Sequence, residues 1–337
     1  MKKHAAWTLV LLVPFAAIVS AAPGRVPLID MWNFSYLGFK GNLYPGMNRM
    51  PPAHEAAGLA HAAAIQPRNT AGFPDPAGRY VLLSIGMSNT TQEFCSQNSQ
   101  LPCNSWTFMG RAAADPAVNH TTLAIVNGAM GGQTASTWDS PTDPNYDIVR
   151  DTKLIPQGLS EAQVQIAWVK VANAGPTVSL PAANSDAYTL ETQMGNIVRA
   201  LKVRYPNMQQ VFLSSRIYAG YATTSLNPEP YAYESGFAVK WIVQAQIDQM
   251  NNGGVPVDPR AGNLDYGTVA PWIGWGAYLW GAGARPRSDG LVWLPGDFVA
   301  DGTHPSQSGQ GKVGSLLMDF FKGSPVTACW FTGGGCP

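Results

Sequence analysis

The segment RYVLLSIGMSNTTQEF, residues 79–94, places a candidate nucleophile directly after an apolar run. The run ends at Gly86, and Ser88 and Asn89 follow it. A serine hydroxyl is a weak nucleophile by itself and needs a base within hydrogen-bond reach. The same letters also fit a structural role, in which Ser88 caps the next helix. The rest of the chain must therefore decide between a nucleophile and a cap.

The chain has five histidines, and His304 has the most suitable neighbours for a catalytic base. It lies in VADGTHPSQSGQGKVGSLLMDFF, three residues after Asp301. This spacing lets the carboxylate accept a hydrogen bond from Nδ1 while Nε2 faces a serine, as a Ser-His-Asp triad requires. The alternative is a turn that leads into a helix capped by Ser306. Packing or surface roles are expected for His54, His61 and His120.

Alternating apolar runs and helical periodicity predict the elements that position these residues. Buried strands are expected at residues 80–85, 123–126, 164–169 and 211–214, and helices at 51–66, 187–205, 231–250 and 307–321. Strands that alternate with helices predict a central parallel sheet in a three-layer α/β/α sandwich. Ligands of such sheets bind outside the carboxyl ends of the strands, where Ser88 is expected. The Gly- and Trp-rich segment 251–297 is expected to be mostly loop, with one short strand.

Three blocks of the sequence, in a fixed order, resemble the SGNH (GDSL-type) hydrolases. IGMSN resembles the block that carries the nucleophile. Met87 stands where the family usually has Asp, and this departure makes the block more similar to the Gly-Gln-Ser-Asn variant of sialate and acetylxylan esterases. IVNGAMGGQTASTW resembles the second block, and DGTHPSQSGQGKVG resembles the last one. The resemblance covers roughly residues 80–321. It implies a flavodoxin-like fold and a serine esterase that needs no metal or cofactor.

The resemblance also implies a role for each matched residue. Ser88 attacks the ester carbonyl, His304 takes its proton, and Asp301 orients the imidazole. The backbone N–H groups of Ser88 and Gly132 stabilise the oxyanion of the tetrahedral intermediate. Losing one such donor lowers the rate by about 10²–10³-fold.

The third block of the family is replaced by VQIAWVKVANAGP, which contains no Gly-x-Asn-Asp. The family places a side-chain oxyanion donor here, an Asn or, in the sialate esterase branch, a Gln. Asn173 has the suitable amide, whereas the register of the strand favours Lys170. Both residues remain candidates for this position.

The predicted substrate is an acetyl ester of a polysaccharide or oligosaccharide, by resemblance to carbohydrate acetylesterases. Asn89 and Trp138 are the predicted substrate contacts. Trp272, Trp275 and Trp280 are either a wall for stacking sugars or ordinary core residues. Two other functions remain open, namely a lipase or short-acyl-ester hydrolase on the same fold, and a secreted glycan-binding protein without turnover.

Composition argues against charged macromolecular partners. The chain has 21 basic and 21 acidic residues, and charged residues make up 12% of it, against about 25% in an average globular protein. Nucleic acid and anionic membranes attract basic surfaces, so neither is an expected partner.

The N-terminal sequence MKKHAAWTLVLLVPFAAIVSAAPG has the basic start, apolar stretch and small residues of a signal peptide. Cleavage near Ala21/Ala22 predicts a secreted or periplasmic protein. The four cysteines are then expected as two local disulfides, Cys95–Cys103 and Cys329–Cys336, while a zinc site is disfavoured because no CxxC pair accompanies them. The predicted organisation is a signal peptide at 1–22, an N-terminal extension at 23–78, a hydrolase domain at 79–325 and a disulfide-closed tail at 326–337.

Overall fold

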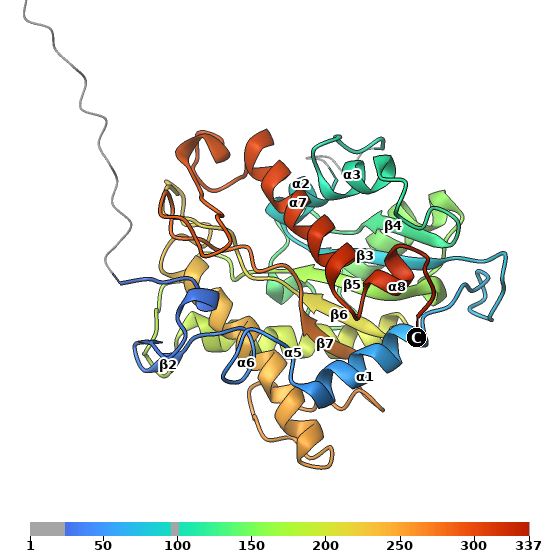
Figure 1. The fold of residues 1–337 in the computed structure, drawn as a ribbon, viewed down its shortest axis with the longest axis horizontal. Coiled ribbons are helices and arrows are strands. Elements are labelled where there is room, and N and C mark those ends of the chain that lie inside the picture. The colour runs from blue at the N-terminus through green and yellow to red at the C-terminus, as the bar shows by residue number, and fades with distance from the viewer. Residues whose placement is uncertain (1–23, 96–100, 337) are drawn as a thin grey trace, which may run out of the picture.

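A computed structural model describes residues 24–95 and 101–336. Within this part of the chain the central sheet has five parallel strands in the order β4-β3-β5-β6-β7 (Figure 1). This order is the flavodoxin-like arrangement predicted from the sequence. The strands are β3 (Tyr80–Gly86), β4 (Leu123–Asn127), β5 (Val164–Lys170), β6 (Gln210–Leu213) and β7 (Trp272–Trp275).

Helices cover both faces of the sheet, which gives the predicted three-layer α/β/α architecture. Helices α5 and α6 pack against each other, while α7 contacts α2, α3 and α8. The helices are α1 (Pro52–Ala63), α2 (Ser88–Phe94), α3 (Phe108–Ala114), α4 (Pro144–Val149), α5 (Asp186–Arg204), α6 (Tyr231–Asn251), α7 (Gln307–Gly323) and α8 (Ala328–Phe331). An antiparallel hairpin of two short strands, β1 (Ser35–Tyr36) and β2 (Phe39–Lys40), precedes α1 in the chain.

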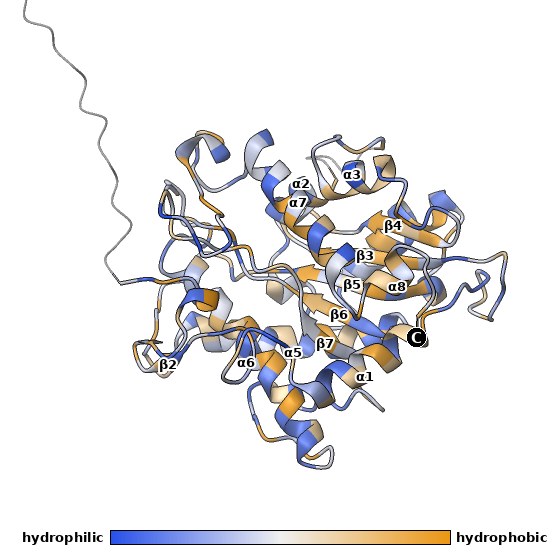
Figure 2. Cartoon of the chain, viewed as in Figure 1, coloured by the Kyte–Doolittle hydropathy of each residue, from blue (hydrophilic) through white to orange (hydrophobic). Residues whose placement is uncertain are grey.

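The central strands are buried on both faces because helices cover both sides of the sheet. Every residue of β3, β5, β6 and β7 is buried. Figure 2 shows the corresponding concentration of hydrophobic residues along the strands. Their sequences are therefore nearly continuous apolar runs, as is typical of parallel strands, and this made β3 to β6 readable from the sequence.

The N-terminal segment packs along the sheet through α1. Gly58 of α1 lies so close to Trp272 that an added Cβ would come within 2.7 Å of its ring. His54 stacks on the same ring at 4.7 Å, and its Nε2 hydrogen-bonds to the carbonyl of Ile273. Burial lowers the pKa of His54 to about 4, so this imidazole is a neutral packing residue.

The structure contains both predicted disulfides, Cys95–Cys103 and Cys329–Cys336. The first one links Cys103 to Cys95, which directly follows α2, the helix that begins at Ser88. The predicted signal peptide and its cleavage site lie outside the described residues. In the part of the chain that is described, no helix is both long and apolar enough to cross a membrane.

Candidate active site

Ser88 is the first residue of α2, two residues after β3 ends at Gly86. Gly86 allows this abrupt change from strand to helix, because a Cβ there would lie 2.2 Å from the carbonyl oxygen of Lys170. Thr90 of α2 donates its hydroxyl hydrogen to the same carbonyl, at 2.7 Å. The first N–H groups of a helix have no acceptor within the helix, so the N–H of Ser88 is available to a ligand.

His304 and Asp301 complete a hydrogen-bonded chain with Ser88. The Ser88 Oγ lies 2.9 Å from the His304 Nε2, and the His304 Nδ1 lies 2.6 Å from the Asp301 Oδ2. The serine and the histidine are 216 positions apart in the sequence. The fold therefore brings together the three residues that the sequence analysis selected, in the order of a Ser-His-Asp triad.

The loop that carries the histidine is fixed by short-range hydrogen bonds. The Asp301 Oδ1 accepts the backbone N–H groups of Thr303 and His304, at 2.8 and 2.9 Å. Gly302 has a φ of +62°, and a Cβ there would lie 1.9 Å from the carbonyl oxygen of Tyr221. Only glycine fits this position, because it tolerates positive φ and the close approach of the loop that follows β6.

Hydrogen bonds keep Asp301 ionised. Partial burial by itself would raise its pKa, but the bonds from the His304 ring and from the N–H groups of His304 and Thr303 lower the pKa below its ordinary value. The lowered pKa favours the ionised carboxylate, which is the form that accepts the hydrogen bond from the His304 Nδ1–H.

The glycine pair of the second sequence block lies beside the serine. A Cβ on Gly131 would lie 3.9 Å from the Cβ of Ser88. Gly132 follows with a φ of +77°, and both glycines are exposed. The Met130 N–H donates to the carbonyl of Gly86 at 3.1 Å, which ties this turn to the end of β3. Gly131, which directly precedes the predicted oxyanion glycine Gly132, thus lies beside the predicted nucleophile.

Each candidate for the third oxyanion position has a hydrogen-bond partner outside the triad. Lys170 is fully buried, and its ammonium group pairs with the equally buried Glu93 of α2. The Asn173 Nδ2 donates to the carbonyl of Asp186 at 2.8 Å. At least one N–H of each group is therefore used by a neighbour that is not part of the triad.

The two predicted substrate contacts are corrected by the structure. Trp138 is completely buried and packs edge-on against Tyr146, so its ring offers no surface for stacking a sugar. Asn89 is 1% exposed, and its Nδ2 donates to the carbonyl of Thr303 at 3.0 Å. Asn89 therefore connects the nucleophile helix to the histidine loop. Trp272, Trp275 and Trp280 are also buried, in agreement with the core interpretation.

A group of buried charges behind the site was missed by the sequence analysis. Glu93 and Lys170 form the ion pair, and Arg216, 1% exposed, lies where its charge affects the pKa values of Glu93 and Lys170. Burial raises the pKa of Glu93 and lowers that of Lys170 to about 8, and the attraction between the two opposes both shifts. The sequence did contain a signal for these buried charges, because a charged residue lies at or just after an apolar strand in WVK, which ends at Lys170, and in LSSR, which ends at Arg216.

The described residues contain no group of three or more His, Cys, Asp or Glu side chains that could hold a metal ion.

Comparison with known proteins gives distant structural matches. No family model matches the chain, and no relative is found among curated proteins. A GDSL-like lipase from Parabacteroides merdae matches with 12% identity over 76% of this chain and 97% of that chain, with a TM-score of 0.38. An extracellular lipase from Streptomyces rimosus matches with 14% identity, 72% and 99% coverage and a TM-score of 0.34. A variant of Axe2, an acetyl-xylooligosaccharide esterase from Geobacillus, matches with 18% identity, 72% and 93% coverage and a TM-score of 0.36.

Proposed function

We propose that this protein is a serine esterase that hydrolyses carboxylic esters through Ser88, His304 and Asp301. The observation that carries the proposal is the continuous hydrogen-bonded chain, with 2.9 Å between the Ser88 Oγ and the His304 Nε2 and 2.6 Å between the His304 Nδ1 and the Asp301 Oδ2. Such a chain activates a hydroxyl that is otherwise a weak nucleophile. A helix cap alone does not account for the histidine and the carboxylate aligned behind the serine.

In the acylation step the Ser88 Oγ attacks the ester carbonyl carbon, and the His304 Nε2 takes the hydroxyl proton. Asp301 accepts the Nδ1–H bond and stabilises the imidazolium that forms. The N–H groups of Ser88 and Gly132 are the proposed donors to the oxyanion. The imidazolium then protonates the departing alcohol, which leaves an acyl group on Ser88.

In the deacylation step a water molecule replaces the alcohol. His304 takes a proton from the water as its oxygen attacks the acyl carbon, and the same two N–H groups stabilise the second oxyanion. The proton then returns to the Ser88 Oγ as the carboxylic acid leaves. The products are one alcohol and one acid, and the enzyme is regenerated.

The proposed substrate is an acetyl ester on a polysaccharide or oligosaccharide. Gly131 and Gly132 are exposed beside a half-buried Ser88, so the approach is open enough for a large alcohol component. The resemblance of IGMSN and GGQTASTW to carbohydrate acetylesterases points to the same class. The protein is proposed to act outside the cytoplasm, where its two disulfides are stable.

An ester panel tests the proposal. Purified protein should release acid from p-nitrophenyl acetate and, more efficiently, from acetylated xylan, while a short-chain triglyceride tests the lipase alternative. Ser88→Ala should lower kcat/KM by about 10⁴–10⁶-fold. Ser288→Ala, at an exposed serine, is the matched control and should keep wild-type activity.

Two results would contradict these assignments. Absence of hydrolysis on every ester of the panel excludes the esterase. Hydrolysis that survives in Ser88→Ala excludes this serine as the nucleophile.

A further inference from the structure

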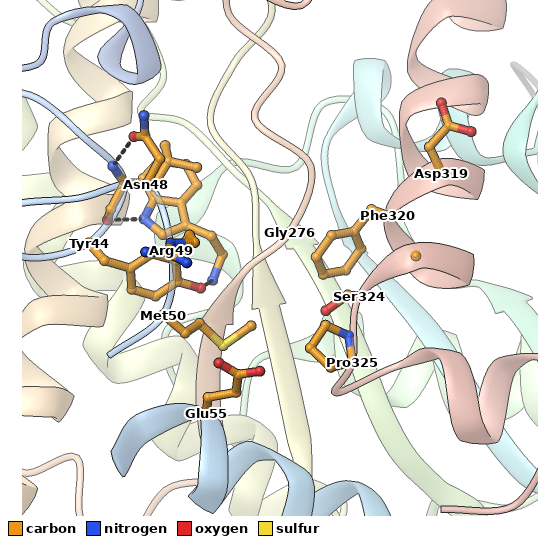
Figure 3. A pocket seen from close by; sticks show the side chains of 13 residues that line it. Tyr44, Asn48, Arg49, Met50, Glu55, Gly276, Asp319, Phe320, Ser324 and Pro325 are labelled. Carbon is orange, nitrogen blue, oxygen red and sulfur yellow. Dashed lines mark hydrogen bonds between the residues drawn. The ribbon is translucent and has the colours of Figure 1, made fainter. Parts of the chain in front are cut away.

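A cavity of about 440 Å³ lies between the N-terminal segment, the end of β7 and the C-terminal end of α7. Figure 3 shows Tyr44 and Arg49 of the N-terminal segment on one side, Phe320 and Ser324 on the other, and Glu55 of α1 below them. Residues 23–78, which the triad does not use, thus build about half of this cavity. It is lined by Leu43, Tyr44, Asn48, Arg49, Met50, Glu55, Trp275, Gly276, Asp319, Phe320, Gly323, Ser324 and Pro325.

Polar groups around this cavity lack partners. Among the described residues, the side chains of Arg49 and Glu55 form neither an ion pair nor a hydrogen bond, although they carry opposite charges and line the same cavity. The Ser324 Oγ is buried and has no hydrogen-bond partner within the described chain. A buried hydroxyl without a partner is unfavourable unless water or a ligand satisfies it.

The cavity also has an aromatic wall with one free side. Phe320 packs against Phe212 and Phe321, at centroid distances of 5.2 and 5.1 Å, and its ring borders the cavity. Tyr44 is fixed on the opposite side because its hydroxyl accepts the N–H of Trp275. The walls are therefore held in place before any ligand arrives, as in most small-molecule sites.

We propose that this cavity binds a neutral oligosaccharide, as a second site separate from Ser88. A sugar presents a C–H face that packs on an aromatic ring and a rim of hydroxyls that both donate and accept. The hydroxyls can donate to Glu55, accept from Arg49 and satisfy the Ser324 Oγ. The lining has one cation, Arg49, against two carboxylates, Glu55 and Asp319, so it gives no net attraction for an anionic ligand. The volume is within the range of small-molecule sites, about 300–1,000 Å³.

The site is distant from the triad. Phe320 lies thirteen residues along α7 from Gln307, which is about 20 Å at the rise of an α-helix, and His304 precedes the start of that helix. A ligand at one end of α7 therefore does not contact Ser88 at the other. Saccharide binding here is independent of turnover, so it can fail or succeed whatever the result of the ester panel.

Isothermal titration of the full protein with xylotetraose, cellotetraose and chitotetraose tests the proposal directly. We expect at least one of them to bind at a single site. Gly323→Phe should abolish this binding, because Gly323 lines the cavity and a Cβ there meets nothing within 4 Å. Gly334→Phe is the matched control, since Gly334 is exposed outside the cavity and has only the Thr332 Oγ1 at 3.9 Å.

Two milder variants keep the test valid if Gly323→Phe fails to fold. Glu55→Gln and Arg49→Ala should each weaken binding about tenfold through the loss of a charge-assisted hydrogen bond. Arg285→Ala, at another exposed arginine, should bind like the wild type. Thermal denaturation followed by circular dichroism checks that each variant is folded.

Three outcomes would overturn the proposal. The first is no binding of any of the three tetrasaccharides, and the second is binding that Glu55→Gln and Arg49→Ala leave unchanged. The third is binding of a zwitterionic dipeptide, glycylphenylalanine, in the absence of saccharide binding, since that result assigns the separated charges to an ionic ligand.

Discussion

The ends of β3 and β5 lie side by side, and yet their polar residues have opposite environments. Gly86 and Lys170 are register partners at these two strand ends, and Ser88 follows Gly86 by two residues. After β3, Ser88 is half-buried and hydrogen-bonded to His304. At the end of β5, Lys170 is completely buried and paired with Glu93. The position at the end of a strand is therefore insufficient to identify a site residue.

Helix α2 accounts for the difference, because it carries both Ser88 and Glu93. The two residues are five positions apart, which is about 140° around a helix. One side of the helix therefore presents Ser88 to the histidine loop while another side directs Glu93 to Lys170. Helix α2 therefore leaves the Ser88 hydroxyl partly exposed and supplies the carboxylate that pairs with the buried Lys170.

The carboxyl groups of the two regions differ in the same way. Hydrogen bonds lower the pKa of Asp301 despite its partial burial, whereas burial raises the pKa of Glu93 despite the nearby lysine. A charge at the surface of a site is stabilised by its donors, and a charge in the core depends on its one partner.

The largest expected effect is that of Asp301→Asn on activity. Asn disrupts the acceptor for the His304 Nδ1–H, so we expect kcat to fall about 10⁴-fold on p-nitrophenyl acetate. The fold should survive, because Asp301 is a partly exposed loop residue. A rate within tenfold of the wild type would show that His304 is oriented by another group.

Lys170→Met should have its main effect on stability. Removal of one partner leaves Glu93 buried without its ion pair, and we expect the free energy of unfolding in urea to fall by about 3–5 kcal/mol. The double variant Lys170→Met/Glu93→Leu should recover most of this loss, because no buried charge of the pair remains. A double variant no more stable than the single one would mean that the pair is not the cause.

Asn89→Ala and Asn173→Ala form a matched pair. Each amide donates one hydrogen bond to a backbone carbonyl, so each substitution should reduce the free energy of unfolding by about 1 kcal/mol. Asn89 ties α2 to the histidine loop, and we expect its loss to lower kcat without changing KM. Steady-state kinetics of both variants decide between positioning and direct participation.

Asn173→Ala should leave kcat unchanged, since its donor is used by Asp186. A fall of about 10²–10³-fold would instead identify Asn173 as an oxyanion donor. That result would restore the third position expected from the sequence.

The smallest expected effect is the pH dependence of the stability that Asp301 contributes. Its folded-state pKa lies below the ordinary value of 3.8, so the folded protein binds this proton less tightly than the unfolded chain. The resulting stability is present above about pH 4 and is lost as the pH falls through the folded-state pKa. The free energies of unfolding of wild type and Asp301→Asn in urea should therefore differ most at pH 6, and the difference should shrink as the pH falls below 3.8. A constant difference down to pH 3 would contradict the lowered pKa.

The sequence by itself determined the sheet, most of its long helices and the three residues that we propose as the triad. Continuous apolar runs are visible because both faces of a parallel sheet are buried. For β7, which is four residues long, the sequence predicted only a short strand somewhere within residues 251–297. The triad residues could be selected because short-range geometry limits Asp-x-x-His and because the blocks follow in order. The two disulfides could also be predicted, because each joins cysteines that are close in the sequence.

Only the tertiary structure decided which polar and aromatic residues reach solvent. Trp138, Asn89 and Lys170 are of types that bind ligands, and all three are buried. Asn89 and Lys170 have partners distant in the sequence, Thr303 and Glu93. The cavity at the end of α7 likewise joins residues 43–55 to residues 319–325, which no local pattern connects. A side chain's type defines the bonds it can make, but its burial depends on which other elements pack over it.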